Sequence, residues 1–180
     1  MATTVAHGLM GIAVYCAARE CLPTLKQLPL SPKMLILAAI AANIPDFDIV
    51  VSFLLLGDHK LLHGVGSHSF LFATLVAVMV WSVGRTKQWP NSFSLLAFLV
   101  VLSHVVVDWL TGPNLGLHSS HGSAFLWPLI ETPISAPITV FKGVNHSALL
   151  PDALYIALWE LFIIGPIVIF ISLFIKKLNH

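Results

Sequence analysis

The chain contains very little charge for its length. Of its 180 residues only 9% are Asp, Glu, Lys or Arg, whereas 57% are hydrophobic and the mean hydropathy is +0.91. A soluble domain has about 25% charged residues, so this composition excludes an ordinary soluble fold. We expect an integral membrane protein whose first partner is the lipid bilayer.

Three further scarcities exclude other classes. The formal net charge is only +1 and no basic stripe is present, which argues against a nucleic-acid partner. The two cysteines, Cys16 and Cys21, do not form a CxxC motif, so neither a disulfide framework nor a zinc-thiolate site is expected. The N-terminal stretch lacks the basic start of a signal peptide, and we interpret it as a retained transmembrane helix.

What the sequence does contain is long apolar segments. Five of them are near the roughly 20 residues that cross a hydrocarbon core, namely 5–18, 34–56, 69–83, 93–110 and 153–175. The second is interrupted by Asn-Ile-Pro-Asp-Phe-Asp at 43–48. We therefore predict an all-α fold: a polytopic membrane bundle of about five transmembrane helices in a single domain, 1–180, with a long outer loop at 111–152.

The basic residues predict the orientation of this bundle, because Lys and Arg are retained on the cytoplasmic side. Seven of the nine lie in the segments after the first, third and fifth spans: Arg19, Lys26, Lys33, Arg85, Lys87, Lys176 and Lys177. Only Lys60 and Lys142 lie in the other loops. The N-terminus is thus expected outside and the C-terminus in the cytoplasm.

Ionisable residues at membrane depth are costly unless they pair, face a cavity or bind an ion. Counted from the nearest cytoplasmic charge at 1.5 Å per residue, the ionisable residues of all five spans lie in one layer, roughly 18–25 Å from the cytoplasmic charges. The main members are His7, Asp46, Asp48, His63, His68, His104, Asp108 and Glu160. Five segments that deliver such groups to one layer predict a common polar site.

Imidazole with carboxylate is a ligand set for zinc, manganese or iron, and the i, i+4 spacing of His104 and Asp108 lets both reach one ion. We predict His7, Asp46, His63, His68, His104 and Asp108 as metal ligands for one or two ions, with Asp108 the best candidate for a bridge. Zinc is favoured and manganese is the alternative. Two bridged ions could activate water for displacement at phosphorus, with Asp48 or Glu160 as catalytic general base.

Structural explanations stay open for each motif taken singly. His104 and Asp108 could form a private hydrogen bond, the PDFD element could cap a helix, and His63-Gly-Val-Gly-Ser-His68 could be an ordinary turn. The outer loop could be a lid over a lipid head group or a packing segment. His118, His121 and His146 lie in that loop, where exposure to solvent is the simpler expectation.

The order of motifs resembles a known family. VAHGLMG, NIPDFD, HGVGSHS, LSHVVVDWLTG, LWP and WELFIIGP follow one another as in the bacterial inner-membrane family typified by YdjM and YbcI, described as membrane-bound metal-dependent hydrolases. That family is in turn distantly similar to zinc-dependent phospholipase C and the fungal zinc nucleases. The resemblance implies a helical core like theirs, an inner-membrane location and metal-dependent phosphoester hydrolysis, with His7, Asp46, His63 or His68, His104 and Asp108 as ligands.

The chain also departs from the family pattern. Where the family commonly has HRGFTHS, this sequence has HGVGSHS, so an arginine that could hold a phosphate is missing, and Lys142 or Lys60 would have to replace it. The HxxxE pair of the soluble enzymes' third metal site is also absent from the sequence. The leading hypothesis is a membrane hydrolase of phosphoesters, with lipid phosphoesters among the candidates, that opens to the extracytoplasmic side. The alternatives are a divalent-ion or proton transporter and a metal-stabilised scaffold without catalysis.

Overall fold

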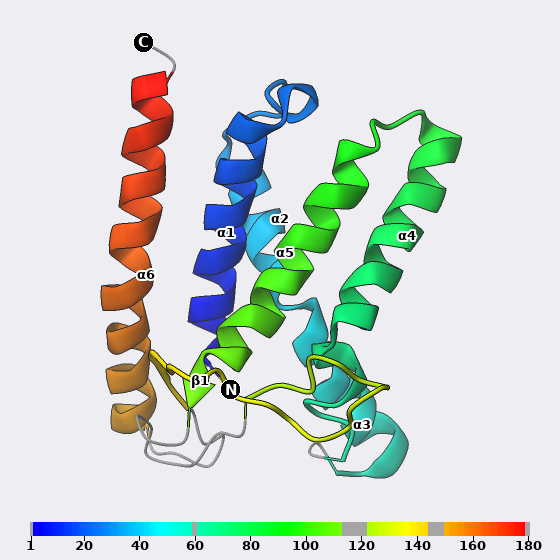
Figure 1. Ribbon diagram of the computed structural model, residues 1–180, viewed down its shortest axis with the longest axis vertical. Helices are drawn as coiled ribbons and strands as arrows, with labels where there is room; N and C mark the ends of the chain where they lie inside the picture. The colour runs from blue at the N-terminus through cyan, green and yellow to red at the C-terminus, as the bar shows by residue number, and fades with distance from the viewer. Residues whose placement is uncertain (1, 59–60, 113–121, 144–149, 179–180) are drawn as a thin grey trace.

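The computed structural model is a bundle of helices that run between two ends of the molecule (Figure 1). It describes residues 2–58, 61–112, 122–143 and 150–178. The helices are α1 (Thr4–Cys21), α2 (Pro32–Ala42), α3 (Phe47–Leu56), α4 (Phe70–Lys87), α5 (Ser92–Trp109) and α6 (Leu150–Leu178). Short 3-10 turns are η1 (Pro23–Leu25), η2 (Ile44–Asp46) and η3 (Gly66–His68). The all-α prediction is confirmed.

Local sequence explains where three helices begin. The hydroxyls of Thr3, Ser31 and Ser69 accept hydrogen bonds from the amides of Ala6, Met34 and Phe72, the arrangement of an N-cap. These contacts satisfy amides that have no partner inside the helix. They fix the starts of α1, α2 and α4.

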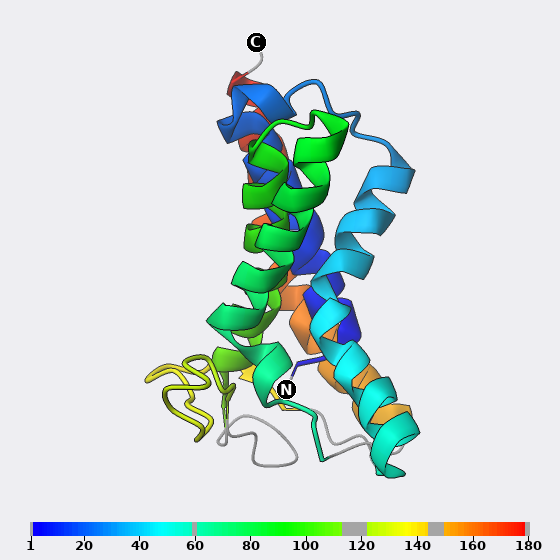
Figure 2. The ribbon, with the colours of Figure 1, turned by 90° about the vertical axis from the view of Figure 1, so that its right-hand side faces the viewer.

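Helix α5 lies at the centre of the bundle and packs against α1, α2 and α4, while α6 packs along α1 (Figures 1 and 2). The approach of α1 to α2 depends on Gly11, where a Cβ atom would lie 2.5 Å from the Ala42 Cβ and 2.7 Å from the Ala38 carbonyl oxygen. Any larger residue there would push the two helices apart. The contact holds the middle of α1 against the end of α2.

Two short parallel strands, β1 (Thr111–Gly112) and β2 (Phe141–Lys142), tie the outer loop to the end of α5. The amides of Val140 and Phe141 donate to the Leu110 carbonyl, and the Ala136 amide donates to that of Trp109 at 2.8 Å. The Phe70 amide donates to the Phe125 carbonyl at 3.0 Å. The described part of the loop is therefore hydrogen-bonded to the start of α4 and to the end of α5.

The number of membrane spans is smaller than the sequence predicted. Within the described residues, three helical segments are long and apolar enough to cross a membrane: Phe70–Lys87, Ser92–Trp109 and Leu154–Ile171. A fourth is added if α2 and the helix that follows it, which meet at 49°, form one broken span. Segment 5–18 is helical within α1 but is not among them, so the prediction of five spans is not confirmed.

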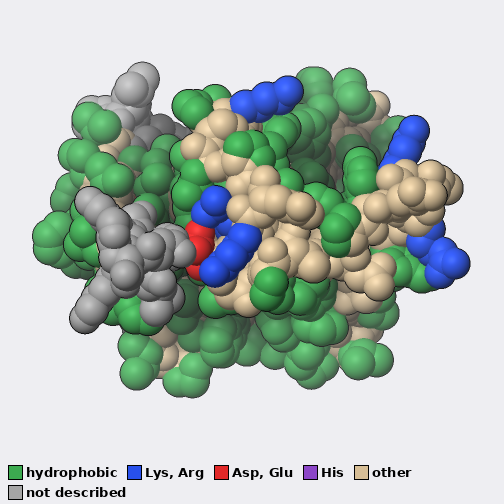
Figure 3. All heavy atoms as spheres, turned by 90° about the horizontal axis from the view of Figure 1, so that it is seen from above, with side chains coloured by type: hydrophobic (Ala, Val, Ile, Leu, Met, Phe, Trp, Pro, Cys, Tyr) green, Lys and Arg blue, Asp and Glu red, His purple; other side chains and the backbone are tan. Residues whose placement is uncertain are grey.

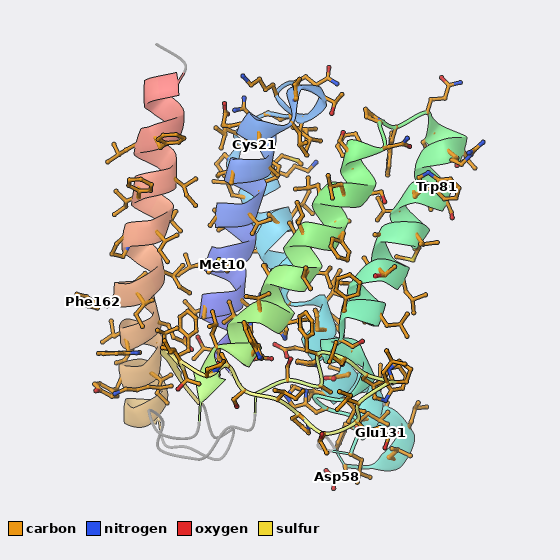
Figure 4. The ribbon with its side chains drawn as sticks, viewed as in Figure 1. Met10, Cys21, Asp58, Trp81, Glu131 and Phe162 are labelled. Carbon is orange, nitrogen blue, oxygen red and sulfur yellow. The ribbon has the colours of Figure 1, made fainter. Side chains whose placement is uncertain are left out.

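The two ends of the bundle differ in charge. Seen from the end where α1 finishes, the surface shows several Lys and Arg side chains in blue, with acidic side chains in red between two of them (Figure 3). Arg19 lies in the last turn of α1, and Arg85 and Lys87 lie in the last turn of α4. Asp58 and Glu131 lie at the opposite end from Cys21 (Figure 4). The first turn of α1 and the last turn of α6 also lie toward opposite ends (Figure 1).

Candidate metal centre

The first part of the site is a pair of buried side chains on α5. His104 and Asp108 are both 0% exposed. Nδ1 of His104 lies 2.9 Å from the Ala42 carbonyl oxygen. Because a carbonyl can only accept, Nδ1 carries the hydrogen and Nε2 is left with a free lone pair. Oδ1 of Asp108 accepts from the Ala2 amide at 2.9 Å, while Oδ2 lies 3.4 Å from His104 Nε2.

The second part is the turn that carries His63 and His68, and Asp48 organises it. The Asp48 carboxylate accepts from His63 Nδ1 at 2.7 Å, from the Gly64 amide at 3.1 Å and from the Ser67 hydroxyl. A glycine-rich turn has few side-chain contacts of its own to fix its shape. The carboxylate therefore supplies the partners that hold this turn against the start of α3.

The same interactions orient the His68 ring. Its Nδ1 lies 2.9 Å from Ser67 Oγ and 3.4 Å from Asp48 Oδ2. Since the Ser67 hydroxyl hydrogen is already donated to Asp48, its oxygen accepts from His68, so Nδ1 of His68 again carries the hydrogen. Nε2 is then directed to the interior. A carboxylate behind a histidine is the usual arrangement around metal-ligating imidazoles.

The donor atoms converge at this point. His68 Nε2 and His104 Nε2 are 3.0 Å apart. Asp108 Oδ2 lies 3.4 Å from each of them, and Asp46 Oδ1 lies 3.3 Å from His68 Nε2 and 3.5 Å from His104 Nε2. His68 Nε2 and His104 Nε2 thus form one triangle of donor atoms with Asp108 Oδ2 and a second triangle with Asp46 Oδ1. Two bare lone pairs at this separation repel, so a proton or a metal ion is needed between them.

His7 lies beside these donor atoms and comes from α1. Its ring stacks on that of His104, with centroids 3.6 Å apart, and its Nε2 lies 3.5 Å from Asp108 Oδ1. The side chain is 1% exposed, and its Nδ1 is buried without a hydrogen-bond partner. A buried polar atom of this kind calls for an explanation such as a bound ion or water.

Protonation of His68 follows from its neighbours. Burial alone would lower the pKa of His68, but hydrogen bonds to Asp46 and Asp48 and the charge of Asp108 raise the pKa to about 9. Below this pH the imidazole holds a second proton between the carboxylates. A divalent ion that binds at neutral pH would have to displace that proton.

The residues fit a divalent metal ion. Ligands bound at about 2.0–2.1 Å around tetrahedral zinc lie about 3.3 Å from one another, close to the 3.0–3.5 Å separations of these donor atoms. Three overlapping groups have ligand atoms within 4.8 Å of one another: His7 with Asp46 and His104, Asp46 with His63 and His68, and His68 with His104 and Asp108. The structure thus brings all six predicted ligands together; that they bind a metal stays a prediction.

The two predicted general bases lie beside this cluster and belong to none of the three groups. Asp48 faces the turn that it organises. Glu160 is 0% exposed on α6, and its carboxylate accepts from the amide of Thr3 at 2.8 Å and from the hydroxyl of the same residue. Their role as general base stays a prediction. Both contact the ligands through neighbouring groups, Asp48 through the turn that carries His63 and His68 and Glu160 through Thr3.

The remaining candidates are less informative. Lys142 Nζ lies 2.6 Å from the Tyr155 hydroxyl and over the rings of Tyr155 and Trp159, at 4.2 and 4.7 Å. It is therefore held at α6, and a contact with phosphate stays a prediction. Lys60, His118, His121 and His146 lie outside the described residues.

Sequence reasoning missed the groups that orient the ligands. These are the Ala42 carbonyl, the Ala2 amide and the hydroxyls of Ser67 and Thr3. The hydrogen-bond partners of backbone groups cannot be inferred from residue identities. The role of the Ser67 hydroxyl could have been predicted from its position next to His68. That of Thr3 could have been predicted from its position as the N-cap of the helix that carries His7.

Replacing Asp48 by asparagine should lower the affinity for Zn²⁺ by about 10–100-fold, the usual effect of removing a carboxylate behind a ligating histidine. The variant would lose the charge that holds the His63 and His68 rings. Titration of purified protein against a competing chelator measures the affinity. Asp58→Asn, an exposed carboxylate at the same end of the molecule, is the control. An unchanged affinity in Asp48→Asn would contradict the orienting role.

Comparison with known proteins identifies the family of the chain. No curated protein and no solved structure is significantly similar to it. A family model described as YdjM inner membrane protein matches residues 1–179. This match agrees with the apolar helices and indicates a protein of the inner membrane. The chain therefore belongs to the YdjM inner membrane protein family.

Proposed function

We propose that the protein is a membrane-bound, metal-dependent hydrolase of phosphoesters, with a centre of one or two ions, most simply zinc. The observation that carries this proposal is the convergence of His68 Nε2, His104 Nε2 and Asp108 Oδ2 at 3.0–3.4 Å in a buried site. Both imidazoles are held through Nδ1, so the ligand set is preorganised.

The division of work among the residues follows from their contacts. His68, His104 and Asp108 would hold the ion, with Asp46 and His7 as further ligands or holders of a second ion, and His63 beside Asp46 and His68. A bound divalent ion lowers the pKa of water and neutralises charge on a phosphoryl oxygen. Asp46, whose side chain is 24% exposed, is the most open of the donors and marks the side from which a substrate would enter. Asp48 or Glu160 would accept the proton of the attacking water.

The proposal is tested by metal analysis followed by an activity screen. Purified wild-type protein should contain one or two equivalents of metal, and hydrolysis of phosphomonoesters and phosphodiesters should depend on added Zn²⁺ or Mn²⁺. His104→Ala should lose both the metal and the activity. Protein that binds no stoichiometric metal would refute the metal centre.

One observation favours a second candidate, a metal-stabilised scaffold. Together with Asp46, the buried residues His68, His104 and Asp108 offer four donor atoms, enough to fill every position of a structural zinc site, which keeps none open for water. In that case the protein retains its metal but hydrolyses none of the phosphoesters tested. Removal of the metal would then lower the melting temperature without any loss of activity to measure.

The orientation of the site is a further part of the proposal: N-terminus outside, C-terminus in the cytoplasm and the metal centre toward the extracytoplasmic side. The basic residues at the end of α1 and α4, opposite to the site, support it. In a Cys21→Ser background, a membrane-impermeant maleimide added to intact cells should label Asp58→Cys and leave Thr86→Cys unlabelled. The reverse pattern would invert the topology.

A further inference from the structure

An apolar groove of about 680 Å³ runs between α1 and α2. Its walls are made mainly of aliphatic side chains: Val5, Leu9, Ile12, Leu35, Ile36 and Ile40. Several of these are well exposed, with Ile36 at 57% and Ile40 at 53%. Within a membrane such a surface is solvated by hydrocarbon rather than by water.

The groove is polar at one end only. Thr4 and Asn43 lie there, at the start of α1 and the end of α2. The Asn43 amide nitrogen donates to the Ala39 carbonyl at 2.8 Å, but its Oδ1 is buried without a hydrogen-bond partner. The groove therefore offers hydrocarbon contacts along its length and polar side chains at one end.

This polar end adjoins the metal centre. Asn43 and Phe47, which line the groove, flank Asp46 in the helix break, and Gly8, also in the lining, follows His7. Asp46 contacts both His68 and His104 and is the most exposed of the donors. The most exposed donor of the metal centre and the polar end of the groove thus both belong to the break between α2 and α3.

We propose that this groove binds one acyl chain of a lipid whose head group lies at Asn43 and Asp46, so that the lipid enters the centre sideways from the bilayer. The change from apolar walls to a polar end matches an amphiphile. A hydroxyl or ammonium of the head group can donate to the Asp46 carboxylate, whose side chain is 24% exposed.

The proposal rests on the proposed function for its reaction, since it makes the substrate a lipid phosphoester, but the binding of the chain is testable without activity. Wild-type protein is placed in vesicles of phosphatidylethanolamine and phosphatidylglycerol that contain a phosphatidylglycerol with a photoreactive acyl chain. After illumination, labelled peptides are mapped by mass spectrometry. Labels should concentrate on residues 4–12 and 35–47.

Two matched variants sharpen the test, because Ile36 in the groove and Leu75 on α4 are both 57% exposed. Ile36→Trp fills the groove and should lower labelling of residues 4–12 by about tenfold, because the indole ring occupies the space of the chain and the displaced chain finds equal hydrocarbon contacts in the bilayer. Leu75→Trp should leave it unchanged. Equal labelling of α4 and the groove, or no effect of Ile36→Trp, would overturn the proposal.

Hydrolysis separates binding of the lipid chain from catalysis. If the protein is a lipid phosphoesterase, Ile36→Trp raises the KM for the lipid and leaves hydrolysis of a small soluble phosphoester unchanged. If wild-type protein hydrolyses neither substrate, the proposed function fails while the labelling result still decides whether the groove binds a lipid chain. If Ile36→Cys instead forms a disulfide between two copies in the membrane, the groove is an interface and the proposal is wrong.

Discussion

Asp108→Asn should lower the affinity of the protein for Zn²⁺ by more than about 100-fold, since loss of a ligand exceeds the effect of losing a residue behind one. The amide oxygen can still accept from the Ala2 amide, so the fold around Asp108 is retained. The amide nitrogen, however, would present hydrogens toward His68 and His104 where Oδ2 now lies at 3.4 Å from each. Competition with a chelator of known affinity measures the change.

Ser103→Ala is the matched control for this result. Ser103 is also buried on α5, but its hydroxyl donates to the Val100 carbonyl and takes no part in the cluster. Its zinc affinity should equal that of the wild type. If Asp108→Asn binds zinc as tightly as Ser103→Ala does, Asp108 is not a ligand, and the convergence of side chains would be a hydrogen-bonded network without an ion.

Glu160→Ala should destabilise the folded protein by about 2–5 kcal/mol, because it leaves a cavity and removes two hydrogen bonds from Thr3. Glu160 lies on the inner face of α6 between Ile156 and Ile164, both 0% exposed, so the change falls inside the contact of α6 with the bundle. Thermal unfolding in detergent, followed by intrinsic fluorescence, measures the loss.

The Glu160→Gln variant distinguishes a structural role of Glu160, as the hydrogen-bond partner of Thr3, from a catalytic role. Glutamine can accept from the Thr3 amide and can donate to the Thr3 hydroxyl, so the melting temperature should stay near that of the wild type. A glutamine cannot accept a proton from water. Wild-type activity in Glu160→Gln would therefore assign Glu160 to holding Thr3 and Ala2, and through Ala2 the Asp108 carboxylate. Loss of activity in a stable Glu160→Gln protein would support the general-base prediction.

The residues of the site could be predicted because the chain is so apolar. In a soluble protein His104 and Asp108 would be two polar residues among many, but here each ionisable group inside a span needs an explanation. The i, i+4 spacing then placed both on one face of α5, and the structure brings them to Asp46 and His68. The roles within the cluster could not be predicted, since they depend on carbonyl and amide groups.

The number of spans was predicted less well, for a physical reason. Helix α1 carries Gly8 and Gly11 for close packing, His7 in the site and Arg19 near its end, and these residues lower its hydropathy. Hydropathy measures the preference of side chains for an apolar phase over water, which lipid-facing positions need most, whereas α1 packs against α2, α5 and α6. For segment 34–56, the sequence located the interruption at Pro45, but the 49° bend there depends on packing that the sequence does not record.

The break between α2 and α3 also determines the chemistry of a histidine that is distant in the chain. In an uninterrupted α-helix the Asp46 amide would donate to the Ala42 carbonyl. Here it donates to the Asn43 carbonyl at 3.2 Å, and the Ala42 carbonyl accepts from His104 Nδ1 instead. The same interruption thus exposes Asp46 and selects the tautomer in which His104 can coordinate. A straightened helix would lose both at once, so the ligand set depends on the kink as much as on the ligands themselves.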